Sequence, residues 1–201
     1  KYHKDSGIEP KSPVRALLGT NEETNMHDVA YYAAHYPMPA FCFTPDAEFP
    51  VCNGEKGGFN GEIVSPKLEN GVILLYKGGV ARNAVPDRAY CTVRVAPDAI
   101  ECTEGVTKEA GENGATVLRG QGKSGHAAMP AGTVNAISLL VDCLLHNHIG
   151  TEAEQAYLRV LQKLHAATDG SAVGIAADDG LFDPLTIIGG TIGQEDGVIR
   201  Q

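Results

Sequence analysis

Several features that would define a function class are missing from this sequence. No apolar stretch reaches the roughly 20 residues that a membrane-spanning helix needs. No basic run, and no basic patch with interleaved aromatic residues, occurs, and the formal net charge of −9 opposes binding to nucleic acid or anionic lipid. The opening residues 1–5 have no apolar core of a signal peptide. We therefore expect no nucleic-acid partner and no membrane association.

The cysteines also lack a pattern. None of the five belongs to a CxxC pair, which disfavours a zinc ribbon or a dithiol redox site, and an odd number cannot pair completely within one chain. We interpret them as reduced, mostly buried small residues of a cytoplasmic protein. Hydrophobic residues make up 43% of the chain and charged residues 20%, which indicates a globular protein rather than a disordered one.

Residues 1–58 are predicted to form part of a parallel α/β layer. The short apolar runs 14–19 and 41–44 favour buried strands. A helix is predicted between them over 28–36, with Asp28 as its cap. The order strand, helix, strand is typical of a parallel sheet.

After residue 58 the sequence changes in character, and residues 59–192 are predicted to form a separate α+β domain. Alternating apolar residues predict antiparallel strands, and longer amphipathic segments predict helices. The predicted strands are 61–65, 72–76, 89–95, 116–119 and 185–188 with 191–192, and the predicted helices are 103–112, 135–146 and 151–167. A hairpin turn is expected at 69–71. Residues 193–201 are expected to return toward the first domain.

Acidic residues follow both strands predicted in the first domain. Glu22 and Glu23 follow the first strand, and Asp46 follows the second. Active sites of open α/β sheets lie beyond the carboxyl ends of the strands. One of two adjacent carboxylates can bind a cation while the other takes a proton from metal-bound water, and oxygen ligands suit zinc or manganese. A solvated loop, with Asp46 starting a turn after Pro45, fits the same residues.

The segments Gly19-Thr20-Asn21-Glu22-Glu23-Thr24 and Phe43-Thr44-Pro45-Asp46-Ala47-Glu48-Phe49-Pro50-Val51 resemble motifs of the co-catalytic zinc metallopeptidases. This family includes PepV-type dipeptidases, carnosinases, ArgE, DapE and aminoacylases, and the second segment is most similar to the PepV-type branch. The resemblance implies that Glu22 is the general base, that Glu23 binds one metal ion and that Asp46 binds the other. It implies two zinc ions per intact site, with manganese or cobalt as alternatives.

Later segments resemble the inserted lid of the same family, which implies a ferredoxin-like lid for residues 59–192. Residues 78–87 contain Asn83, which the resemblance assigns to substrate contact. Residues 122–130 contain His126, which would polarise the scissile carbonyl and stabilise the oxyanion. Arg200 is similar to an arginine that binds the substrate carboxylate. Without the resemblance, Asn83 fits a turn residue and His126 a surface-loop residue.

Part of the family pattern is not found in these 201 residues. The one His-x-Asp tripeptide, His3-Lys4-Asp5, is not taken as the family's upstream motif, so Glu23 and Asp46 are the expected metal ligands that are present. We expect the intact enzyme to hydrolyse dipeptides, and this chain alone to be inactive and to bind no metal. Two alternatives stay open: a non-catalytic lid-type module for dimerisation or substrate binding, and a deacylase of N-acyl amino acids. A homodimer through apolar strand edges or the lid sheet is a further hypothesis.

Overall fold

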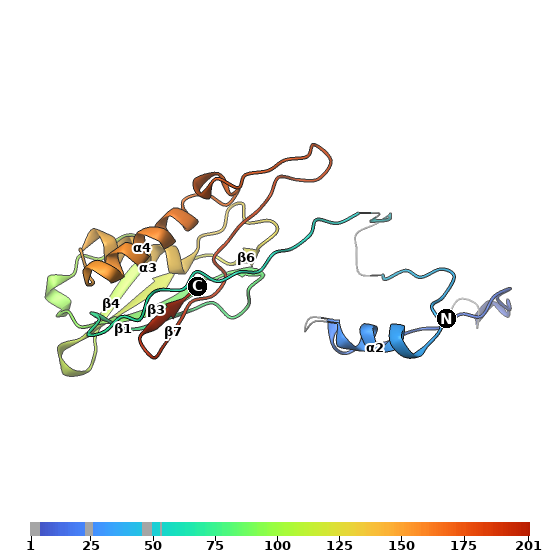
Figure 1. Cartoon of the computed structure of the whole chain (residues 1–201), viewed down its shortest axis with the longest axis horizontal. Helices are drawn as coiled ribbons and strands as arrows, with labels where there is room; N and C mark the ends of the chain where they lie inside the picture. The colour runs from blue at the N-terminus through green and yellow to red at the C-terminus, as the bar shows by residue number, and fades with distance from the viewer. Residues whose placement is uncertain (1–4, 23–25, 46–49, 53) are drawn as a thin grey trace. The chain divides into compact units, whose positions relative to one another are not determined.

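The computed structural model describes residues 5–22, 26–45, 50–52 and 54–201. The chain divides into two compact units, Lys1–Asn53 and Gly54–Gln201 (Figure 1). Within the described ranges, no helix is long and apolar enough to cross a membrane.

The first unit contains the helix α2, His27–His35, which confirms the helix predicted over 28–36. Asp28 is not its cap. Met26 occupies the N-cap position with a φ of 52°, and the Asp28 carboxylate instead accepts hydrogen bonds from the backbone nitrogens of Thr20 and Asn21, at 2.8 and 3.1 Å. The bond from Thr20 is the main cause that lowers the pKa of Asp28. Asp28 therefore organises the loop that precedes the helix.

The parallel sheet predicted for this unit is not formed among its described residues. The runs 14–19 and 41–44 have no strand partners there, and their apolar side chains are exposed, Leu18 by 92% and Phe41 by 81%. The reason is physical: α2 buries none of its side chains, so this unit offers little apolar surface for a strand to pack against. An apolar run becomes a strand only when a neighbour can pair with it.

The second unit is built on an antiparallel four-stranded sheet in the order β1-β3-β5-β4. The strands are β1 (Ile73–Gly78), β3 (Arg88–Val93), β5 (Thr116–Gln121) and β4 (Val106–Ala110). The strands predicted over 72–76, 89–95 and 116–119 are confirmed. The helix predicted over 103–112 is wrong, because residues 106–110 within this range form the edge strand β4, which is connected to its partner β5 through the 3-10 turn η3 (Glu112–Gly114).

Two helices lie side by side over one face of this sheet, as Figure 1 shows. They are α3 (Ala136–His146) and α4 (Glu152–His165), and both were predicted. Asn135 caps α3 by accepting a hydrogen bond from the backbone nitrogen of Ile137, at 2.9 Å. The apolar face of α3 packs on β3 and β5 and forms the centre of the core with Tyr76, Leu118, Ile137, Leu140, Leu144, Leu158 and Leu161.

The element order differs from the alternating order of a ferredoxin-like fold. Both α3 and α4 follow the strands of the sheet, whereas a ferredoxin-like chain places its first helix after its first strand. The unit is mixed α/β with an antiparallel sheet, as the α+β prediction requires. The helix expected at 103–112 is replaced in the structure by β4.

The chain ends in the hairpin β7 (Gly193–Glu195) and β8 (Val198–Arg200). This hairpin belongs to the second unit, and Ile199 is buried in its core. Residues 61–65 run along β8 instead of pairing with β1 across the turn expected at 69–71: Ile63 and Gln201 exchange backbone hydrogen bonds of 2.6 and 3.0 Å. No strand forms at 185–188, although Ile192 bridges to Gly78.

The second unit also contains short elements. They are β2 (Ala84–Val85), β6 (Gly125–His126) and the 3-10 turns η2 (Pro97–Ala99) and η4 (Ser171–Val173). The five cysteines, all within the described ranges, form no disulfide. The prediction that most are buried is wrong, because only Cys91 and Cys143 are buried, whereas Cys42, Cys52 and Cys102 are exposed.

Candidate functional site

The short strands β2 and β6 bring two predicted site residues together. Ala84 pairs with His126 and Val85 pairs with Gly125 in an antiparallel ladder. Asn83 directly precedes β2, and its carbonyl oxygen accepts a hydrogen bond of 2.9 Å from the backbone nitrogen of Ala127. Asn83 and His126 are far apart in the sequence, yet they lie at one end of the same two-stranded ladder.

Neighbouring segments hold this ladder in place. Lys123 and Val134 exchange backbone hydrogen bonds of 2.8 and 3.0 Å, and the Ser124 hydroxyl donates to the carbonyl oxygen of Val85 at 2.9 Å. A side chain at Gly122 would collide with the carbonyl oxygen of Val134, so the close approach requires glycine. The segment that carries His126 is therefore fixed from both sides.

The His126 side chain is exposed, and its ring is oriented by its own segment. Its Nδ1 accepts a hydrogen bond from the backbone nitrogen of Ala128, at 3.2 Å. A ring nitrogen that accepts carries no proton, so the neutral imidazole carries its proton on Nε2. The exposed Nε2–H can donate a hydrogen bond to a carbonyl oxygen or to an oxyanion.

Arg200 lies in a cluster of charges that also contains Arg82. One guanidinium nitrogen of Arg200 is 3.7 Å from Oε2 of Glu62, and one of Arg82 is 3.7 Å from Oε1 of the same carboxylate. Arg82 directly precedes Asn83, so this cluster adjoins the β2–β6 ladder through the chain. Asn83, His126 and Arg200 thus all belong to the second unit. Arg82 was not predicted from the sequence, although it lies within the segment 78–87 that indicated Asn83.

The backbone around Arg82 is closely packed. A Cβ atom built on Gly190 would lie 2.5 Å from the carbonyl oxygen of Arg82, and one built on Gly79 would collide with the carbonyl oxygen of Gly190. Gly79 has a φ of +74°, which favours glycine independently. The loop that carries Arg82 and Asn83 therefore lies directly against the segment at Gly190.

Glu22 belongs to the first unit and is exposed there. Its loop is closed by hydrogen bonds from the backbone nitrogen of His27 to the side-chain oxygen of Asn21, at 2.9 Å, and from Met26 to the carbonyl oxygen of Asn21, also at 2.9 Å. Glu22 and His126 belong to different units.

The two predicted metal ligands, Glu23 and Asp46, lie outside the described residues. Among the residues that are described, no group of three or more His, Cys, Asp or Glu side chains could hold a metal ion. The described part of the chain therefore assembles no metal site by itself.

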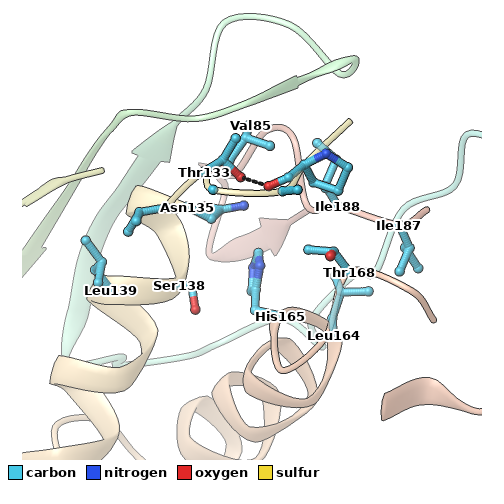
Figure 2. A pocket seen from close by; sticks show the side chains of 14 residues that line it. Val85, Thr133, Asn135, Ser138, Leu139, Leu164, His165, Thr168, Ile187 and Ile188 are labelled. Carbon is cyan, nitrogen blue, oxygen red and sulfur yellow. Dashed lines mark hydrogen bonds between the residues drawn. The ribbon is translucent and has the colours of Figure 1, made fainter. Parts of the chain in front are cut away.

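A pocket of about 320 Å³ is lined by residues 130–135, which follow His126 in the chain, and by residues of α3 and α4 (Figure 2). His165 projects into it from α4 toward Asn135, whose side-chain nitrogen donates to the carbonyl oxygen of Gly189 at 2.9 Å. The His165 ring also contacts the Gln201 side chain at 3.1 Å, and burial lowers the pKa of His165. His126 is not among the described residues that line this pocket.

Comparison with known proteins shows a relation to dipeptidases. The chain is 29% identical to the putative dipeptidase YtjP of Bacillus subtilis over 211 aligned residues, which cover 98% of this chain and 46% of the relative. It is 31% identical to the beta-Ala-Xaa dipeptidase of Lactobacillus delbrueckii subsp. lactis over 198 residues, or 90% of this chain and 41% of the relative. A putative dipeptidase of Staphylococcus aureus is 29% identical over 170 residues.

The chain is thus a distant homologue of dipeptidases and spans less than half the length of each of these relatives. No protein-family model matches it.

Proposed function

We propose that this chain is part of a metal-dependent hydrolase that cleaves dipeptides. The observation that carries the proposal is the β2–β6 ladder, which places Asn83 beside His126 and leaves an Nε2–H donor exposed. The relation to dipeptidases supports the reaction class. In this proposal, residues 1–58 belong to the catalytic domain, residues 59–192 to a lid, and residues 193–201 return toward the catalytic domain.

His126 has the role that its tautomer permits. Its Nε2–H would donate to the scissile carbonyl oxygen of the peptide. That hydrogen bond strengthens as negative charge develops on the oxygen, which lowers the barrier to attack. Asn83, at the same end of the ladder, would contact the substrate, and Arg200 would bind its carboxylate. The tautomer matters because a ring that presented an unprotonated nitrogen would repel the oxyanion.

Glu22 would be the general base that takes a proton from the attacking water and returns it to the leaving amine. Glu23 and Asp46 would bind zinc, with manganese or cobalt as alternatives, and metal dependence is consistent with the relation to dipeptidases. The ligands that complete such a site would come from outside these 201 residues. This chain alone would then be inactive.

The substrate would be a dipeptide, and the name of the Lactobacillus relative makes a β-alanyl dipeptide a natural first substrate to test. An N-acyl amino acid offers the same carbonyl and carboxylate, so a deacylase is the alternative enzyme. A non-catalytic binding or dimerising module is the alternative without chemistry.

The experiment compares three substrates with a form of the protein extended at both ends to the length of its relatives. β-Alanyl-alanine, alanyl-alanine and N-acetyl-alanine are incubated with it and with zinc, beside the variants Glu22→Gln and His126→Ala. We expect hydrolysis of a dipeptide that is lost in Glu22→Gln and reduced by about 10²- to 10³-fold in His126→Ala. Cleavage of N-acetyl-alanine alone would establish the deacylase, and cleavage of none would favour the binding module.

A further inference from the structure

Three segments that are distant in the sequence meet at Glu62. Arg82 comes from the loop after β1, Arg200 from β8, and Glu62 from the segment that runs along β8. Each oxygen of the Glu62 carboxylate faces a different guanidinium, at 3.7 Å in both cases. One carboxylate thus bridges two arginines that the fold brings together.

The charges of this cluster do not balance. Two guanidinium groups and one carboxylate leave one positive charge, in a chain whose net charge is −9. A second anion at this position is therefore favoured over a cation. All three side chains are about half exposed or more, so a small ligand can reach them.

The distances leave room for a second carboxylate. Guanidinium–carboxylate hydrogen bonds are normally about 2.7–2.9 Å long and often come in parallel pairs. At 3.7 Å, Glu62 forms ion pairs with Arg82 and Arg200 without using either guanidinium as a bidentate fork. A ligand carboxylate that binds the guanidinium groups in the bidentate geometry would form stronger hydrogen bonds and would displace Glu62.

We infer that Arg82 joins Arg200 in a two-arginine clamp for the carboxylate of the ligand, and that Glu62 is a positioning residue that this carboxylate displaces. Glu62 holds the two guanidinium groups near each other against their mutual repulsion while the clamp is empty. It also competes with the ligand, because it is itself a carboxylate. The inference rests on the proposed function in that a dipeptide has a free carboxylate of the required kind.

The position of Arg82 supports this role. Its backbone is held against Gly190, and the next residue, Asn83, accepts the hydrogen bond that joins the loop to the His126 segment. A carboxylate at the clamp would therefore lie on the loop that carries Asn83, and this loop is joined to the His126 segment by that hydrogen bond. Arg82 would recognise the end of the substrate, while those residues act on its peptide group.

The test measures carboxylate binding to the 201-residue chain, where no hydrolysis is needed. Alanyl-alanine is titrated into isotope-labelled protein, and the side-chain Nε–Hε signals of Arg82 and Arg200, assigned with Arg→Lys variants, are followed by NMR. The C-terminal amide of alanyl-alanine is the control ligand. We expect both signals to shift with the dipeptide and neither to shift with the amide; a shift of Arg200 alone removes Arg82 from the clamp.

The variant Glu62→Gln decides the role of Glu62. If Glu62 only supports the structure, its substitution should weaken binding of the ligand carboxylate. If Glu62 competes with that carboxylate, its substitution should strengthen binding. We expect about two- to fivefold tighter binding of alanyl-alanine, in line with the loss of an exposed ion pair. The charge-matched control is Glu104→Gln, an exposed residue in the turn before β4, which should leave the affinity unchanged.

Unchanged or weaker binding in Glu62→Gln would overturn the displacement, provided that thermal unfolding shows the variant to be folded. If it does not fold, Glu62→Ser in the same titration provides the comparison. If the clamp binds carboxylate but the extended protein cleaves no dipeptide, the proposed function is contradicted and the clamp is not. If the extended protein cleaves dipeptides but Arg82 does not respond to the carboxylate, the clamp is contradicted and the proposed function is not.

Discussion

The carboxylate of Glu154, in the first turn of α4, accepts a hydrogen bond of 2.9 Å from the backbone nitrogen of Ile73, the first residue of β1. Its other oxygen accepts from Val72 at 3.0 Å and from Thr151, the cap of α4, at 2.6 Å. Glu154 is completely buried. One carboxylate therefore satisfies N–H groups of both the helix start and the sheet edge.

The variant Glu154→Gln tests this anchor. Its amide nitrogen would face N–H donors at a buried site, so at least one donor would lose its acceptor. We expect the free energy of unfolding of the second unit to fall by about 2–4 kcal/mol, measured by urea denaturation followed by circular dichroism. The matched control, Glu152→Gln in the same turn but exposed, should change it by less than about 0.5 kcal/mol. Equal losses would contradict the anchor.

The parts of the fold that were predictable have local signals. Asn135 and Thr151 are both of residue types favoured at helix N-caps, each precedes an amphipathic segment, and each caps its helix. The edge strand β4 has no comparable signal, because its pairing with β5 decides its conformation. The strands predicted at 14–19 and 41–44 do not form, for the converse reason. Their composition favours strands, but they lack a strand partner among the described residues of that unit.

In the candidate site, too, local sequence signals identify single residues but not the contacts between distant segments. Asn83, His126 and Arg200 could be named individually from short motifs. Their spatial relations could not, because the contact between Asn83 and Ala127 and the bridge of Glu62 between two arginines depend on pairing across long stretches of chain. The tautomer of His126 likewise depends on one hydrogen bond from Ala128.

That tautomer is a testable property. We expect the neutral His126 ring to carry its proton on Nε2, because Nδ1 accepts from Ala128. Long-range ¹H–¹⁵N correlation spectra of the histidine rings above pH 8 distinguish the two tautomers directly. The substitution Ala128→Pro removes the donor and should shift the population toward the Nδ1–H form. A ring that is already Nδ1–H in the unchanged protein would remove the donor role proposed for His126.

His165 predicts a pH dependence of stability. Burial is the main cause that lowers its pKa, and the Gln201 hydrogen bond and the charge of Asp142 act in the opposite direction. The unfolded chain, with a histidine pKa of about 6.5, then binds the proton more tightly than the folded chain. Stability present above pH 6.5 is therefore lost as the pH falls below it.

The measurement for His165 is urea denaturation at pH 7.5 and 5.5. We expect the unchanged protein to lose more stability over this range than His165→Gln, with a difference of at most about 1.4 kcal/mol per pH unit. The control His148→Asn changes an exposed histidine and keeps a residue that tolerates its positive φ of 51°. An identical pH profile for His165→Gln and the unchanged protein would show that His165 takes up its proton equally well in both states.

Two glycines of the same segment test whether the Arg82 loop must stay where it is. A Cβ on Gly190 would lie 2.5 Å from the carbonyl oxygen of Arg82, whereas a Cβ on Gly193 would meet nothing within 4 Å. Gly190→Ala must therefore push the loop away, while Gly193→Ala adds a methyl group in open space. We expect Gly190→Ala to weaken alanyl-alanine binding about threefold or more, and Gly193→Ala to leave it unchanged, in the same NMR titration. Both substitutions add the same methyl group. Equal affinities of the two variants for alanyl-alanine would therefore mean that the clamp tolerates displacement of its loop. Binding would then depend on the reach of the Arg82 side chain rather than on the backbone that carries it.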